Sequence, residues 1–147
     1  MRFQRLGRTS LSIAALATAI PMLLSQSAAA SASSAPLMWA FDKCATGPGV
    51  WQGTATGPGN IQEPLKTQLT SFRATGDVLH VDFNWYVGDT YLARLSGTLN
   101  LKTGAVVMNG QVAEGSYVGS QVHEEGQLYD SARSCFAGTI QVMPASA

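Results

Sequence analysis

The chain has 147 residues and a formal net charge of zero, with nine basic and nine acidic side chains. A chain without excess positive charge or basic clusters lacks the electrostatic surface that nucleic-acid partners require, so none is expected. It contains only two histidines, so we expect no metal site. No sequence motif indicates a particular reaction or an organic cofactor. We therefore expect the protein to act without an organic cofactor.

The first 30 residues have the three parts of a secretory signal peptide. Arg2, Arg5 and Arg8 form a positive start, residues 11–24 form an apolar run, and a tract of small residues follows. The apolar run is shorter than the roughly 20 residues that a membrane-spanning helix needs. We therefore expect residues 1–30 to be cleaved, leaving no membrane association, and the protein to be secreted to the periplasm or the cell exterior.

After cleavage, residues 31–38 are expected to be a disordered linker and residues 39–147 a single domain. Removing the signal peptide leaves six basic and nine acidic residues, a net charge of −3. A chain of this length is large enough to bury a core of its own. The sequence does not determine the oligomeric state.

Cys44 and Cys135 are the only cysteines, and both lie in the exported part. In an oxidising compartment such a pair is expected to form a disulfide. The bond requires the two Cα atoms to come within about 7 Å, which brings the first and last strands together.

Alternation of apolar and polar residues predicts strands throughout the exported part. The clearest strand spans Val78–Val87, and its alternate residues from Leu79 to Val87 form one apolar face. We expect four of them to be buried together (Leu79, Val81, Phe83, Trp85). Successive hairpins imply an antiparallel meander. The sequence therefore predicts an all-β fold, a small antiparallel β-barrel of about seven or eight strands closed by the terminal disulfide; a β-sandwich is the alternative.

Matching the apolar faces of neighbouring strands fixes the expected register, since a slip of one residue would turn every side chain over. A three-residue loop pairs Phe83 with Leu95, and the next turn pairs Leu95 with Gly110. Polar side chains then gather on the opposite face, where we expect solvent and an ion pair between Asp82 and Arg94. A three-residue turn at residues 114–116 would place Val118 on the inner face.

Three polar residues are candidates for acid–base chemistry: Glu124, His123 and His80. The predicted register places Glu124 on the inner face of the sheet, where burial would raise its pKa. We expect instead that a bulge or strand end places this carboxylate in water. His80 and His123 fall on the outer face, as expected for a solvated strand surface.

Three aromatic residues are candidates for ligand binding: Tyr86, Tyr117 and Trp51. We also consider Trp39 as a candidate for an exposed aromatic platform. Small inner residues, including Gly97 and Gly110, leave three alternatives open. They provide space for a ligand, they let curved strands approach each other, or they receive the larger Met108 and Leu95.

The preferred functional hypothesis is a cofactor-free module that binds a small apolar or partly polar ligand. A cofactor-free barrel enzyme, an isomerase, cyclase or hydrolase using Glu124 with a histidine, is the alternative from another class. A structural or protein-interaction surface protein is the third. A pocket enclosing Glu124 would favour the enzyme, and an apolar pocket without a carboxylate would favour the binding module. A filled core would favour the interaction protein.

Overall fold

The computed structural model describes residues 35–145, so the predicted signal peptide lies outside the described residues. These residues form eight strands and one short 3-10 helix, η1 (Pro58–Asn60). The strands are β1 (Leu37–Gly47), β2 (Val50–Thr56), β3 (Gln62–Thr75), β4 (Val78–Val87), β5 (Tyr91–Asn100), β6 (Ala105–Gly115), β7 (Gln121–Asp130) and β8 (Cys135–Met143). β1 includes Leu37 and Met38, the last two residues of the segment that we expected to be a linker.

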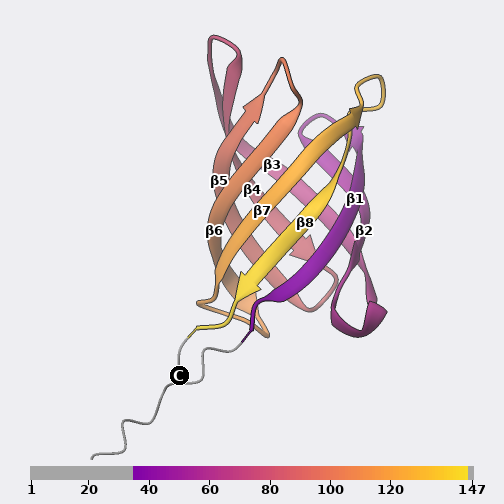
Figure 1. Ribbon diagram of the computed structural model, residues 1–147, viewed down its shortest axis with the longest axis vertical. Helices are drawn as coiled ribbons and strands as arrows, with labels where there is room; N and C mark the ends of the chain where they lie inside the picture. The colour runs from indigo at the N-terminus through magenta and orange to yellow at the C-terminus, as the bar shows by residue number, and fades with distance from the viewer. Residues whose placement is uncertain (1–34, 146–147) are drawn as a thin grey trace, which may run out of the picture. The chain divides into compact units, whose positions relative to one another are not determined.

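The strands follow one another around a closed antiparallel barrel (Figure 1). Each strand pairs with the next in sequence, and β1 pairs with β8 from Leu37–Val142 to Cys44–Cys135. The predicted meander barrel is therefore confirmed, and the sandwich alternative is wrong. Four turns ring one end, at residues 48–49, 76–77, 101–104 and 131–134; we call it the disulfide end, and the other the opposite end.

The predicted register is confirmed across the centre of the barrel. Phe83 pairs with Leu95, and Leu95 pairs with Gly110. Along β4, Val81 and Trp85 are buried as expected, whereas Leu79 and Phe83 are only half-buried. These two side chains line a cavity, which accounts for the difference.

The turn between β6 and β7 differs from the expected three-residue loop. It spans residues 116–120, and the Ser120 and Gly119 amides donate hydrogen bonds to the Tyr117 and Val112 carbonyls. Gly119 adopts a φ of 84°, a left-handed conformation that glycine adopts without strain. Val118 is therefore 61% exposed in the turn, and its prediction as an inner-face residue was wrong.

Aromatic side chains fill the opposite end of the barrel. The Trp39 and Tyr91 rings meet edge to face with centroids 5.7 Å apart, and Tyr91 and Tyr117 meet in the same way. A Cβ atom at Gly57 would lie 2.5 Å from the Trp39 ring, so only glycine fits there. Trp39 is 3% exposed, and its consideration as an exposed platform was wrong.

The small residues on the inner face receive large neighbours. A Cβ atom at Gly97 would lie 2.7 Å from Met108 Cγ, and one at Gly110 would lie 2.9 Å from Leu95 Cδ2. The nearest atoms are backbone atoms of the neighbouring strand, since the same Cβ atoms would lie 2.0 Å from the Val107 carbonyl oxygen and 1.9 Å from that of Arg94. The structure therefore supports close strand approach together with packing of Met108 and Leu95, rather than space for a ligand at these two glycines. Both side chains are almost fully buried.

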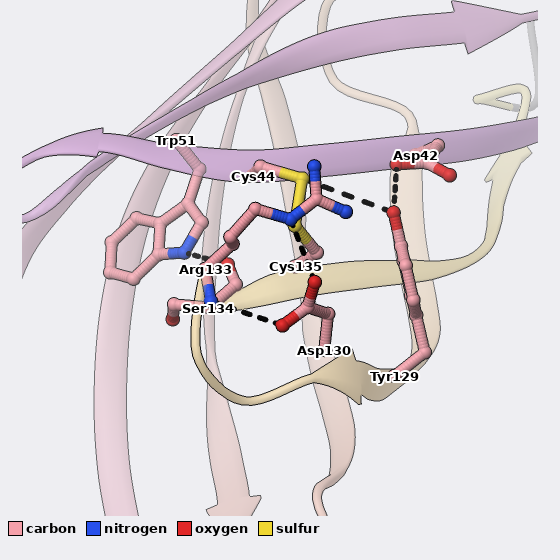
Figure 2. The surroundings of a disulfide bond; sticks show 8 residues. All are labelled: Asp42, Cys44, Trp51, Tyr129, Asp130, Arg133, Ser134 and Cys135. Carbon is pink, nitrogen blue, oxygen red and sulfur yellow. Dashed lines mark hydrogen bonds and ion pairs between the residues drawn. A yellow bond between two sulfur atoms is a disulfide. The ribbon is translucent and has the colours of Figure 1, made fainter.

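The disulfide joins Cys44 of β1 to Cys135 at the start of β8, with Cα atoms 4.0 Å apart (Figure 2). Trp51 lies on one side, and its indole N–H donates to the Ser134 carbonyl at 3.0 Å. Tyr129 lies on the other side of the bond. The disulfide indicates a non-reducing compartment. Among residues 35–145, no helix is long and apolar enough to span a bilayer.

Candidate functional site

A cavity of about 100 Å³ lies inside the barrel toward the disulfide end. Its walls are mainly apolar, but two charged side chains, Lys43 and Glu124, also line it. The largest apolar wall residues are Trp51, Leu69, Leu79, Phe83, Leu99 and Phe136. The volume is below the roughly 300 Å³ at which pockets for drug-sized ligands begin, so the enclosed space suits only a small group.

Lys43 and Glu124 project inward from β1 and β7. Lys43 follows Trp39 and Phe41 at alternate positions of β1, and all three are buried. Glu124 follows Val122 on the inner face of β7. The Lys43 Nζ lies 3.9 Å from Glu124 Oε1, and the two side chains are 5% and 1% exposed. The expectation that a bulge or strand end places Glu124 in water was therefore wrong.

Aromatic rings surround the Lys43 ammonium. Its Nζ lies 3.7 Å from the Trp85 ring centroid, 5.2 Å from that of Phe41 and 5.4 Å from that of Phe83. The negative face of an aromatic ring stabilises a nearby cation, most strongly when the cation is desolvated. The rings therefore hold the end of the lysine side chain in a fixed place beside Glu124.

Burial shifts the pKa of both groups toward neutrality. It raises the pKa of Glu124 from 4.5 to about 7, and the positive charge of Lys43 opposes this rise. Burial lowers the pKa of Lys43 from 10.5 to about 8, and the negative charge of Glu124 opposes this fall. Each group can therefore gain or lose a proton close to neutral pH.

The second carboxylate oxygen, Glu124 Oε2, is buried and has no hydrogen-bond partner among the described residues. A buried polar atom without a partner costs about 1–3 kcal/mol, and more when it is charged. Because Glu124 lines the cavity, a group entering there can approach it. The arrangement combines a proton donor or acceptor, an amine and an apolar wall.

The structure does not bring the predicted histidines to this carboxylate. The ring of His123 lies on the outer surface, with Nδ1 2.7 Å from Asn109 Oδ1 and Nε2 3.1 Å from Glu125 Oε1. His80 belongs to the outer face of β4 and borders a surface hollow with Asp82. The pairing of Glu124 with a histidine was therefore a wrong prediction, and Lys43 is its partner instead.

The three aromatic candidates lie in three different places. Trp51 lines the cavity and meets Phe83 edge to face with centroids 5.4 Å apart. Tyr86 lies on the outer face, with the Lys66 Nζ 5.8 Å from its ring centroid. Tyr117 packs at the opposite end. Only Trp51 among them adjoins the Lys43–Glu124 pair.

The outer polar row is a solvent face, but its expected ion pair does not form. The Asp82 carboxylate accepts hydrogen bonds from the Ser71 and Ser96 hydroxyls, which lower its pKa. Within residues 35–145, no ion pair joins Asp82 to Arg94. The hydroxyls of neighbouring strands satisfy the carboxylate in place of the guanidinium.

Sequence reasoning missed Lys43, although the sequence contains a signal for it. Leu37, Trp39, Phe41 and Lys43 alternate along one strand, so the lysine shares a face with three apolar residues. A charged residue at such a position faces the core unless the strand ends before it. Because β1 continues to Gly47, Lys43 remains within the strand and its side chain faces the core.

Within the part of the chain that the structure describes, no group of three or more His, Cys, Asp or Glu side chains is placed to hold a metal ion. No known protein family, curated protein or solved structure matches this chain.

Proposed function

We propose that the protein binds a small neutral molecule with an apolar body and one polar group, which enters the cavity beside Lys43 and Glu124. The observation that carries this proposal is the buried ion pair, whose Glu124 Oε2 has no partner. Burying two charges costs several kcal/mol per ion before their attraction is counted. A barrel that needed only a core would be served as well by apolar residues here.

The charges of the site favour a neutral ligand. Lys43 and Glu124 together carry no net charge when both are ionised, and the remaining walls are mainly apolar. An anionic ligand would lie close to Glu124, and a cationic one close to Lys43. Like charges in a poorly hydrated site repel strongly. A hydroxyl or carbonyl group meets both residues without this repulsion.

The volume limits the part of the ligand that is enclosed. An apolar cavity of about 150 Å³ binds benzene, so about 100 Å³ holds only about four non-hydrogen atoms by proportion. A longer apolar chain would continue toward the disulfide end, where Leu69, Leu79 and Leu99 are half-buried. We therefore favour a short aliphatic chain with a neutral polar head.

The location we propose for this function is outside the cytoplasm. The features of residues 1–30 are those of a secretory signal peptide, and the Cys44–Cys135 disulfide agrees with an oxidising compartment. A binding protein in that location meets small molecules from the surroundings of the cell.

The test is calorimetric titration with straight-chain alcohols from 1-butanol to 1-octanol, together with carboxylates and amines of matched length. We expect the alcohols to bind more tightly than either charged series, with affinity rising as the chain lengthens. Equal binding of the matched carboxylate and alcohol would contradict the proposal, as would no binding of any alcohol.

A matched pair of variants locates the site. Leu99→Gln places a polar group in the cavity wall, whereas Leu101→Gln changes an exposed residue of the adjoining turn that does not line the cavity. We expect Leu99→Gln to weaken alcohol binding at least tenfold and Leu101→Gln to leave it unchanged. Equal effects would place binding elsewhere.

Acid–base catalysis is the second candidate. A pocket that encloses Glu124 favours an enzyme, but both histidines expected to assist this carboxyl lie on the outer surface, so we place binding first. General acids and bases work best with a pKa near the operating pH, and burial raises the pKa of Glu124 to about 7. Lys43, in place of the predicted histidine, would be the partner of Glu124 in this catalysis. Turnover of a bound carbonyl compound that is lost in Glu124→Gln, with binding retained, would establish catalysis; unaltered turnover would exclude this carboxyl.

A further inference from the structure

We propose that Lys43 forms a covalent imine with short aliphatic aldehydes, and that Glu124 transfers the protons that this reaction requires. This inference rests on the proposed function, since the aldehyde must first enter the cavity as a neutral ligand. It goes further by naming the reactive ligand class and the bond that forms.

Three contacts place the Lys43 amine for such a reaction. The Trp85 ring lies 3.7 Å from Nζ and fixes the end of the side chain. Glu124 Oε1 lies 3.9 Å from Nζ, within reach of a shared proton after a small movement. Lys43 also lines the cavity, so an aldehyde carbon inside it can approach the nitrogen.

The other described lysines lack these features. The Lys102 side chain is 73% exposed and forms an ion pair with Asp77. Lys66 is an exposed residue of β3 beside Tyr86. Neither of them lines the cavity or contacts a buried carboxyl group. Lys43 does both, and its burial lowers its pKa to about 8, which favours the free amine needed for attack.

The reaction starts from the neutral form of the pair, in which Glu124 holds the proton and Lys43 is a free amine. The Nζ lone pair forms a bond to the aldehyde carbon, and one N–H proton moves to the oxygen, giving a carbinolamine. Glu124 then protonates that hydroxyl, which leaves as water as the carbon–nitrogen double bond forms. The products are a protonated imine, a Glu124 carboxylate and one water molecule.

The imine product matches the charge and polarity of the cavity as the starting Lys43–Glu124 pair does. The protonated imine carries one positive charge beside the Glu124 carboxylate, so the site again has no net charge. The aldehyde chain lies among apolar wall residues. Excluding water from these walls slows hydrolysis, which needs a water molecule to attack the imine carbon.

The experiment is reductive trapping with butanal and cyanoborohydride at pH 7.5, followed by peptide mass mapping. Reduction converts the imine into a stable butyl-lysine. We expect Lys43 to be butylated at least tenfold faster than Lys66 or Lys102. Similar rates at the three lysines would overturn the proposal, and this comparison within one wild-type protein needs no variant to fold.

Variants then separate the role of each residue. Lys43→Arg keeps the charge but cannot form the imine, and Lys66→Arg is its matched control; only the former should abolish fast trapping. Glu124→Gln should slow trapping at Lys43 by about 100-fold, as for loss of a positioned proton donor. An unchanged rate in Glu124→Gln would remove the carboxyl from the reaction.

Competition with 1-butanol distinguishes failure of this inference from failure of the proposed function. If the alcohol binds but butanal is not trapped at Lys43, the imine is wrong and neutral-ligand binding stands. If neither compound enters the cavity, both proposals are wrong. If the alcohol also slows trapping at Lys43, the two ligands share the site, as expected.

Discussion

At the scale of single residues, the buried pair of Lys43 and Glu124 is the least expected feature of this barrel. Their charged atoms lie 3.9 Å apart with almost no exposure. In a protein interior such a pair often contributes less stability than well-packed apolar residues of similar size. Stability alone therefore does not explain the pair, which is why we propose a role in binding for it.

The pair should make stability depend on pH in two opposite ways. Burial raises the pKa of Glu124 from 4.5 to about 7, so between these values the folded state binds more protons and stability falls as pH rises. Burial lowers the pKa of Lys43 from 10.5 to about 8, so stability rises from about pH 8 to 10.5. Over each pH range the free energy of unfolding should change by about 3 kcal/mol, at 1.36 kcal/mol per pKa unit.

Urea unfolding between about pH 4.5 and 10.5 measures both changes in stability. The reference protein is the double variant Lys43→Met with Glu124→Leu, which has neither titrating group. The free energy of unfolding of the wild type relative to this variant should be lowest between about pH 7 and 8. A difference that does not change with pH would show that the two groups are hydrated.

The same double variant tests whether the charges serve the fold. At pH 7.5 we expect it to be as stable as the wild type or up to about 4 kcal/mol more stable, as for other buried pairs replaced by apolar residues. Either single change should be less stable than the double, because it leaves one buried charge alone. Alcohol binding should be lost. A double variant that unfolds more easily than both singles would give the pair a structural role.

At the scale of a single strand, β4 shows how a cavity changes the energetics of an alternating pattern. Trp85 and Phe83 share the inner face, yet Trp85 is fully buried and Phe83 is half-buried. Phe83 borders the cavity, so it has fewer neighbours on one side. Asn84 lies between them on the outer face.

Alanine substitutions along β4 should therefore rank in a definite order. Trp85→Ala should cost about 3–5 kcal/mol, as for other buried aromatic residues. Phe83→Ala should cost less, because its side chain already contacts open space, and Asn84→Ala should change stability by no more than about 0.5 kcal/mol. Denaturant unfolding of the three variants gives the order. A cost at Asn84 equal to that at Trp85 would mean that the outer face is also covered.

At the scale of the whole molecule, two kinds of bond close the barrel between β1 and β8. The backbone pairs run from Leu37–Val142 to Cys44–Cys135, and the disulfide covalently joins the last pair. The cysteines are separated by 91 positions in sequence. The bond therefore restricts the unfolded chain strongly, while the backbone pairing sets the topology of the folded state.

Replacing both cysteines with serine should lower stability without changing the fold. The chain-entropy account gives an upper value of about 4–5 kcal/mol for a loop of this length. The far-ultraviolet circular dichroism spectrum should be retained, while the urea midpoint falls. Thiol titration of denatured, unreduced wild-type protein provides the control and should find no free thiol. Two free thiols would mean that backbone pairing alone closes the barrel.

The sequence by itself determined the strands of the central barrel, their register and the disulfide. A period of two leaves a single register in which Phe83, Leu95 and Gly110 face the core together, because a shift by one residue exposes every apolar side chain. The same alternation placed Glu124 on the inner face, although we expected a bulge or strand end to move its carboxylate into water. Local pattern is sufficient for these features because adjacent strands also pair with each other in space.

Only the tertiary structure decided what Glu124 faces. Its partner, Lys43, lies 81 positions earlier in the sequence, and closure of β1 onto β8 leaves only β8 between β1 and β7, so that both side chains enter the same part of the interior. The cavity likewise depends on how side chains of different strands pack, among them Trp51 of β2, Phe83 of β4 and Phe136 of β8. Packing across a closed barrel involves residues from all of its strands, and no local sequence pattern specifies how they divide that space.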